Sequence, residues 1–182
     1  MSRRYTEKEN RLIEKAIKFL VKEYDKTGFN EKPVIFHSLR VACRLVEIDA
    51  LPTIVAAAVL HDLTEDSKIT LDQVRRGFGD KVARLVGAVS FKSDIADKEK
   101  QYKEVFERIE KAGEQALIIK CADILDNSDY YSFGKNKEHE NLLMNKLNYF
   151  LKIAQPVIGK TILFKKLNKR YKILSSEYKK SL

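Results

Sequence analysis

Glycine and proline are scarce in this chain, and their scarcity constrains the fold more than any other feature. The 182 residues include 7 Gly and 3 Pro. Sandwiches, barrels and disordered linkers need more of both residues, because these residues make turns and loops. Hydrophobic residues make up 44% of the sequence, which is enough for one domain with a core. The chain is therefore predicted to be all-α.

Apolar residues recur at helical spacing along the sequence. Thr6 and Glu9 form a capping-box pattern, which predicts the start of a first helix. The stripe expected to face the core on this helix is Leu12, Ile13, Ala16, Ile17, Leu20, Val21 and Tyr24. Further helices are expected over 34–48, 52–60, 70–79, 81–90, 97–112 and 114–129, and two or more over 140–178 with a break at Pro156. The only linker-like stretch is 26–32, and no segment shows the alternation of a strand.

Two of these segments are apolar on nearly every side. The helix that begins near Pro52 is apolar through Leu60, and the helix over 114–129 has an apolar centre over 116–125. A helix that is hydrophobic all round is buried. Both are predicted to lie at the centre of the fold.

Neither a membrane span nor a secretion signal is expected. The longest apolar stretch, 51–60, is about half the length that a bilayer crossing needs, and no apolar core follows the N-terminal arginines. Cys43 and Cys121 are too few for a disulfide framework. We therefore expect a cytoplasmic protein that does not interact with membranes.

Polar groups stand in both central helices, where burial needs a reason. His61-Asp62 is predicted to end the first of them, with Glu65-Asp66 one turn later, and Asp123 lies in the apolar run of the second. A buried carboxylate costs roughly several kcal/mol unless a cation or hydrogen bonds meet it. Together with His37, two imidazoles and two carboxylates suit a divalent transition metal.

Each of these residues also has a simpler interpretation. His37 could be a hydrogen-bonded structural histidine, and Glu65-Asp66 could be a solvated helix end. Asp123 could pair with a nearby cation such as Lys120. His139, between two glutamates, is expected at the surface.

The joint pattern of these residues resembles the HD-domain metal phosphohydrolases. The superfamily pattern is a His, a His-Asp pair and a distant Asp, matched here by His37, His61-Asp62 and Asp123. Within the superfamily the chain is most similar to the RelA/SpoT-type hydrolase domains and the small stand-alone alarmone (ppGpp) hydrolases. Four segments carry the similarity: KPVIFHSLRVA over 32–42, HDLTED over 61–66, FGDKVARLVGAVS over 78–90 and IKCADILDN over 119–127.

The resemblance implies a role for each matched residue. His37, His61, Asp62 and Asp123 would bind one Mn²⁺, although another divalent metal could take its place. Glu65 and Asp66 would position or deprotonate the attacking water, and Asn127 would contact the nucleotide. The implied reaction is hydrolytic removal of the 3′-pyrophosphate from a guanosine nucleotide, catalysed by a hydrolase domain over 1–155.

The chain departs from the family where the substrate phosphates bind. The loop before His37 holds only Lys26 and Lys32 as cations, and Asp126 adds a negative charge. Lys92 and Lys120 are the candidate replacements for substrate binding. The sequence therefore leaves open another nucleotide or a small phosphate ester as the substrate.

The net charge of +9 belongs to one end of the chain. From Lys146 onward there are ten Lys or Arg and one acid, Glu177, while the rest is neutral. The segment 156–182 is predicted to be a basic helical extension packed on the same domain. A second hypothesis is a non-catalytic HD scaffold that binds nucleic acid through KKLNKRYK, over 165–172. We favour the simpler interpretation, in which these lysines form the solvated face of an amphipathic helix.

Overall fold

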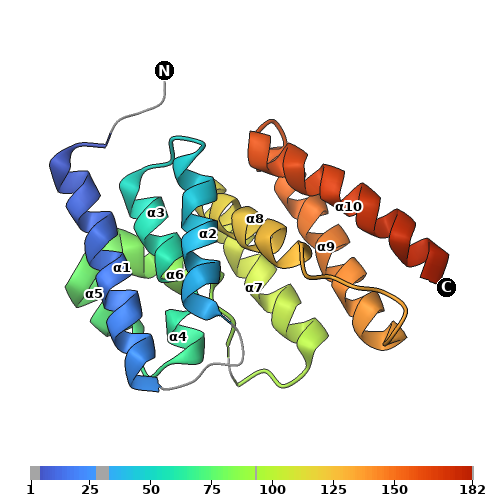
Figure 1. The fold of residues 1–182 in the computed structure, drawn as a ribbon, viewed down its shortest axis with the longest axis horizontal. Coiled ribbons are helices and arrows are strands. Elements are labelled where there is room, and N and C mark those ends of the chain that lie inside the picture. Colours follow the sequence, from blue (N-terminus) through green and yellow to red (C-terminus); the bar gives the residue numbers. More distant parts are fainter. Residues whose placement is uncertain (1–4, 28–32, 93, 182) are drawn as a thin grey trace. The chain divides into compact units, whose positions relative to one another are not determined.

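The computed structural model describes residues 5–27, 33–92 and 94–181, and these residues form ten α-helices and no strand (Figure 1). The predicted all-α fold is confirmed. The helices are α1 (Glu7–Thr27), α2 (Val34–Val46), α3 (Pro52–Val59), α4 (Leu63–Asp66), α5 (Leu71–Phe78), α6 (Asp80–Val89), α7 (Lys98–Ala112), α8 (Glu114–Ser128), α9 (Lys137–Ile158) and α10 (Ile162–Ser181). The chain divides into two compact units, Met1–Ser93 and Asp94–Leu182. In the described part of the chain, each helix is too short or too polar to cross a membrane.

Helix α3 is the core of the first unit. It packs against α1, α2 and α6 (Figure 1). Every residue from Ile54 to Leu60 is buried. Pro52 stands in its first turn, where the missing N–H removes no intrahelical hydrogen bond. The prediction of a central helix in this segment is confirmed.

Side-chain caps fix the starts of α1 and α5 where the sequence predicts them. The Thr6 N–H donates to Glu9 Oε2 at 2.8 Å, and the Glu9 N–H donates back to Thr6 Oγ1 at 3.3 Å. Thr70 and Gln73 form the same capping box at the start of α5. Gly79 ends α5 with a φ of 86°, a left-handed conformation that glycine adopts without strain. The stripe on α1 faces the core, except for Val21, which is 44% exposed.

Helix α8 has the same central place in the second unit. It packs against α7, α9 and α10, and it buries Lys120, Asp123 and Asp126 beside its apolar residues. Phe106 of α7 stacks on Tyr149 of α9, with ring centroids 5.9 Å apart. The last helix, α10, contacts α8 and α9 and buries Leu163, Phe164, Leu167 and Leu174.

Three predicted boundaries are wrong. The helix predicted to end in His61-Asp62 ends at Val59, so that these two residues lie in a turn before the short helix α4. The helix that holds Pro156 continues to Ile158, because a proline in the last turn removes only one hydrogen bond. The break falls instead at Thr161, whose hydroxyl accepts from the Phe164 N–H at 3.2 Å and so starts α10. The predicted linker over 26–32 begins inside α1, and its residues 28–32 lie outside the described residues.

Candidate metal centre

His61 is fully buried in the turn between α3 and α4, and its backbone environment fixes its tautomer. The ring atom Nδ1 lies 2.8 Å from the carbonyl oxygen of Ala58. A carbonyl oxygen only accepts hydrogen bonds, so that Nδ1 carries the proton and donates it. The other ring nitrogen, Nε2, then presents a lone pair. This is the arrangement by which proteins orient an imidazole that binds a metal ion.

Asp62 brings its carboxylate to both histidines of the first unit. Its Oδ1 lies 3.1 Å from His61 Nε2, and its Oδ2 lies 3.7 Å from His37 Nε2. The two imidazole rings lie 5.2 Å apart between centroids. Although Asp62 occupies the cap position of α4, its side chain caps no backbone N–H. A nitrogen lone pair and a carboxylate oxygen at this distance repel each other unless a proton or a cation lies between them.

The carboxylate of Glu65 is held in place by the segment that follows α6. Glu65 lies on α4 with its side chain half-buried, and its Oε1 accepts a hydrogen bond of 2.7 Å from the backbone N–H of Phe91. Asp66, the next residue, is exposed. The interpretation of this pair as a solvated helix end therefore fits Asp66 and does not fit Glu65.

Ser90, which follows α6, forms hydrogen bonds with the turn that holds His61 and with α4. Its hydroxyl lies 2.8 Å from the carbonyl oxygen of His61, and it accepts a hydrogen bond of 3.0 Å from the hydroxyl of Thr64. These contacts connect three residues of the HDLTED segment, His61, Thr64 and Glu65, to 90–91. Sequence reasoning included Ser90 in a matched segment and gave it no role.

Tyr24 is a residue near these acids that sequence reasoning assigned only to the core. It lies on α1 and is 2% exposed. Burial raises the pKa of its hydroxyl well above the ordinary value, and the carboxylates of Asp66, Asp62 and Glu65 raise it further. The tyrosine therefore stays neutral and can donate a hydrogen bond toward the acids. The sequence places Tyr24 on the buried stripe of α1 and gives no sign of the acids that it faces.

A hollow of about 630 Å³ opens beside Glu65 and Asp66. Its volume lies within the usual range for small-molecule sites, about 300–1,000 Å³. Its remaining walls are Glu23, Lys26, Ser67, Lys68 and Ile69. Nζ of Lys26 lies 2.8 Å from each carboxylate oxygen of Glu23, so that Lys26 already forms an ion pair with that residue. Lys92, predicted to bind substrate, is exposed just after Phe91.

In the second unit, α8 brings together the other predicted site residues. Asp123 is 4% exposed, and its Oδ2 lies 2.8 Å from Nζ of Lys120, which is 1% exposed. The exposed Asn127, one turn further along, donates from Nδ2 to Asp123 Oδ1 at 2.6 Å. The ion pair anticipated as the simpler interpretation of Asp123 is thus present. The Asp123 carboxylate contributes to raising the pKa of Tyr131, behind the larger effect of burial.

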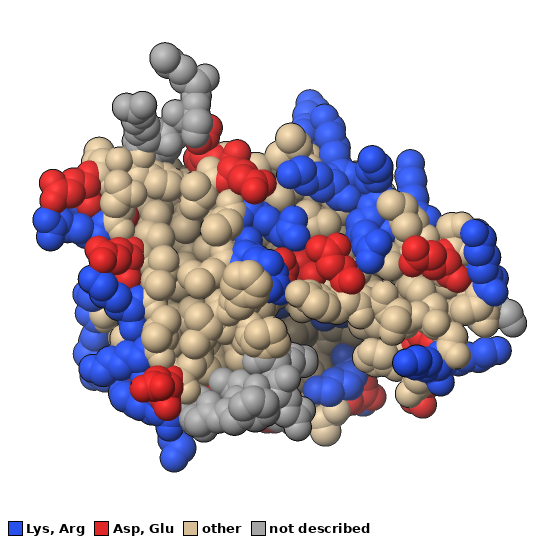
Figure 2. All heavy atoms as spheres, in the orientation of Figure 1, with Lys and Arg blue, Asp and Glu red and all other residues tan. Residues whose placement is uncertain are grey.

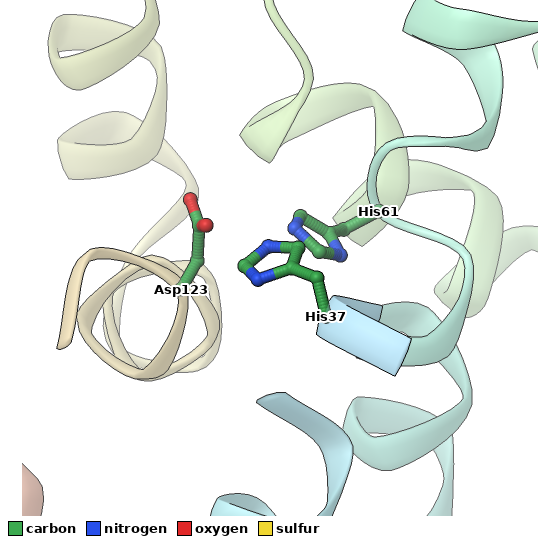
Figure 3. Close-up of side chains that lie close together, drawn as sticks. All are labelled: His37, His61 and Asp123. Carbon is green, nitrogen blue, oxygen red and sulfur yellow. The ribbon is translucent and has the colours of Figure 1, made fainter. Parts of the chain in front are cut away.

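Figure 3 shows three side chains that could each supply one metal ligand, a ring nitrogen or a carboxylate oxygen: His37 on α2, His61 after α3 and Asp123 on α8. His139, by contrast, is exposed at the start of α9, as the sequence predicts.

These features define the class of protein. An all-helical chain in which a buried histidine and the aspartate after it follow a central apolar helix, with a second histidine beside them, is an HD-type helical domain. The HD domain family matches residues 16–155, and the chain belongs to this family.

Named relatives are similar to this chain over part of their length. A guanosine-3′,5′-bis(diphosphate) 3′-pyrophosphohydrolase of Aquifex aeolicus is 32% identical over 121 residues, which cover 63% of this chain and 17% of the relative. A GTP pyrophosphokinase of Streptomyces antibioticus is 32% identical over 158 residues, which cover 84% of this chain and 18% of the relative. The chain thus spans less than a quarter of the length of these curated relatives.

Solved structures share the fold. A metazoan ortholog of SpoT, described as hydrolysing ppGpp, superposes with a TM-score of 0.77 at 20% identity and covers 94% of this chain and 98% of its own. A Listeria monocytogenes protein superposes with a TM-score of 0.66 at 22% identity and covers 81% of this chain and 98% of its own.

Proposed function

We propose that this protein is a metal-dependent phosphohydrolase that removes the 3′-pyrophosphate from guanosine 3′,5′-bis(diphosphate). The observation that carries the proposal is the environment of His61. The Ala58 carbonyl holds Nδ1, so that the lone pair of Nε2 is available beside the Asp62 carboxylate. Two hydrogen-bond acceptors then face each other, the Nε2 lone pair and an Asp62 carboxylate oxygen. A histidine with only a structural role would gain nothing from this arrangement.

The ligands in this proposal are His37, His61, Asp62 and Asp123, and the metal is Mn²⁺. Two imidazole nitrogens and two carboxylates fit a divalent transition metal better than Mg²⁺ or Ca²⁺, which prefer oxygen. A cation held by His61 and Asp62 would offset the repulsion between His61 Nε2 and Asp62 Oδ1. When bound, such an ion would neutralise phosphate charge and make a water molecule more acidic.

Glu65 and Asp66 act on the water in this scheme. The Phe91 N–H holds the Glu65 carboxylate in position, and in this proposal that carboxylate accepts a proton from the attacking water. The exposed Asp66 is placed to orient the same water or to pass its proton to solvent. Tyr24, which stays neutral, can donate a hydrogen bond toward these acids and does not compete as a base.

The substrate assignment is supported by the relatives. The names of those from Aquifex aeolicus and Mycoplasma pneumoniae both specify the 3′-pyrophosphohydrolase activity. Asn127 would contact the nucleotide, and Lys92 and Lys120 would attract its phosphates. Lys68, in the wall of the hollow beside Asp66, adds a cation that sequence reasoning did not consider.

A smaller nucleotide or phosphate ester is the second candidate. Lys120, predicted to bind the substrate phosphates, forms an ion pair with Asp123 instead. The buried Asp126 adds negative charge to α8. Both features weaken the attraction for a substrate with four phosphates.

The two candidates separate in a hydrolysis panel on purified protein. We expect Mn²⁺-dependent release of pyrophosphate from guanosine 3′,5′-bis(diphosphate), abolished by a chelator and by Glu65→Gln. Release of orthophosphate from nucleoside 3′- or 5′-phosphates, with none of the pyrophosphate product, would favour the smaller ester. No hydrolysis of either with Mn²⁺, Mg²⁺ or Co²⁺ would overturn the proposed activity.

Lys92→Ala tests the substrate contact in the same assay. We expect a higher KM with an unchanged kcat, since charge-assisted contacts contribute roughly 1.5–3 kcal/mol each. Lys98→Ala, an exposed lysine on α7, is the matched control. An unchanged KM in Lys92→Ala would remove this residue from the site.

The remaining assignments belong to the same proposal. Residues 1–155 form the hydrolase domain and 156–182 a helical extension, which the packing of α10 on α8 and α9 supports. Both cysteines are free thiols, as a cytoplasmic location favours.

A further inference from the structure

Helix α10 carries seven Lys or Arg and one acid, Glu177, whereas α1 and α7 carry nearly as many acids as cations. On α1, Lys18 lies 2.6 Å from Glu14, and on α7, Lys103 lies 2.6 Å from Glu99. Helices with such pairs at i and i+4 neutralise their own charge. With one acid on α10, five of its exposed lysines form no ion pair with any described residue: Lys165, Lys169, Lys172, Lys179 and Lys180.

The packing of α10 keeps these lysines on its solvent side. The buried residues Leu163, Phe164, Leu167 and Leu174 attach the other side to α8 and α9. Lys165, Lys169 and Lys172 follow one another at spacings of four and three residues, which places them along one face. Figure 2 shows Lys and Arg side chains gathered along this helix. Since like charges so spaced repel each other, the helix carries an electrostatic cost that a bound polyanion would remove.

We propose that this lysine face, Lys165, Lys169, Lys172, Lys179 and Lys180, binds the phosphate backbone of a nucleic acid. Lys165, Lys169 and Lys172 follow one another at about 4.5–6 Å along the helix axis, and Lys179 and Lys180 lie about 10 Å further on, from a rise of about 1.5 Å per residue. That spacing suits a linear array of phosphates. The contacts would be made to the backbone and would not depend on base sequence.

A membrane surface is the other polyanion to consider, and the structure favours nucleic acid over it. An interfacial helix inserts its apolar face between lipids, whereas the apolar face of α10 is already buried against α8 and α9. The exposed apolar residues of this helix are Ile162 at its start and Ile173 on its outer side, and they form no continuous stripe. The exposed side of α10 thus presents positive charge and no apolar stripe that could insert into a membrane.

The test measures binding of the full chain to a fluorescein-labelled 20-base-pair DNA and to a 20-nucleotide RNA by anisotropy, from 50 to 200 mM KCl. With five phosphate contacts we expect affinity to fall on the order of 10²–10³-fold across that range. Replacing three lysines, as in Lys165→Gln, Lys169→Gln and Lys172→Gln, reduces the slope of log K against log salt by about 2–3. The triple substitution leaves the hydrolysis of phosphate esters unchanged, because none of the three residues belongs to the catalytic machinery.

The matched control removes the same charge from another helix of the same unit, as Lys98→Gln, Lys100→Gln and Lys111→Gln on α7. It should retain the wild-type slope to within about 1. Equal losses in both triple variants would show an effect of net charge alone and overturn the proposal. Absence of binding at 50 mM KCl, or binding of phosphatidylserine vesicles in preference to both nucleic acids, would also overturn it.

Discussion

The carbonyl oxygen of Ala58 accepts a hydrogen bond of 2.8 Å from Nδ1 of His61, and this contact decides which ring nitrogen is available for chemistry. The two residues are three apart, at the point where α3 gives way to the turn over 60–62. If the helix continued as a regular α-helix, the Ala58 carbonyl would be the acceptor for the N–H of Asp62. Because α3 ends early, the Ala58 carbonyl accepts from the His61 side chain instead, and Nε2 is the ring nitrogen that keeps its lone pair.

His61→Gln tests this assignment through metal binding. We expect Mn²⁺ affinity to fall by at least about 10–100-fold, because the substitution removes the imidazole and its fixed orientation. Isothermal titration calorimetry with MnCl₂ measures the change without relying on activity. His139→Gln is the matched control, since that histidine is exposed on α9 and should leave both affinity and stoichiometry unchanged. If His61→Gln binds Mn²⁺ as the wild type does, His61 is a structural residue.

Glu65→Gln separates catalysis from metal binding. The glutamine oxygen can still accept from the Phe91 N–H, so that the fold and the position of the side chain are retained. Loss of the base lowers kcat by about 10²–10⁴-fold. Asp66→Asn is expected to lower kcat as well, by a smaller factor within that range, because its exposed side chain lacks such a fixed position. Steady-state kinetics beside a metal titration gives both readouts, and wild-type kcat in both variants would show that the water loses its proton to another group.

Much of the fold could be predicted from local signals. The boxes at Thr6 and Thr70 set helix starts through bonds within four residues, and the apolar runs over 52–60 and 116–125 required burial on every side. The boundaries that failed carry weaker signals in the sequence. The end of α3 at Val59 is marked by neither glycine nor proline, and the break before α10 depends on a single threonine hydroxyl.

The candidate site was predicted by motif, and its supporting contacts were not. The HDLTED pattern names His61, Asp62 and Glu65, but nothing in it identifies the Phe91 N–H or the Ser90 hydroxyl that hold them. Those contacts join residues 26 to 29 positions apart, and only the packing of α6 brings them together. Tyr24 is a similar case, because a tyrosine on a buried stripe gives no sign of the acids that it faces.

Ser90→Ala should weaken the first unit and misplace the turn. The hydroxyl links the His61 carbonyl to Thr64, and its removal leaves buried groups with one partner fewer. We expect a loss of about 1–3 kcal/mol in the free energy of unfolding. Urea denaturation measures it, with Ser176→Ala on the exposed side of α10 as the matched control. Equal stability of the two variants would mean that the Ser90 contacts contribute nothing net.

Glu140 gives a prediction for pH dependence. Its carboxylate is buried at the start of α9, and its Oε1 accepts from the N–H groups of Gly134, Lys135 and Asn136 at 2.7, 2.9 and 3.0 Å. Burial alone would raise the pKa of this carboxyl, but the three hydrogen bonds outweigh burial and lower it. A carboxyl whose pKa is lower in the folded state stabilises the fold above its unfolded pKa of about 4.3. That stabilisation is lost as the pH falls through the folded value.

Glu140→Gln should therefore lower Tm at pH 7, and the difference from wild type should shrink as the pH falls below about 4. The glutamine oxygen can accept the same hydrogen bonds, so that the change in Tm reports the charge rather than a lost contact. Differential scanning calorimetry at pH 7, 5, 4 and 3 follows the difference, with Glu138→Gln, an exposed neighbour on α9, as the control. A difference in Tm that stays constant from pH 7 to pH 3 would show that the charge of Glu140 does not hold the segment 134–136 to the helix.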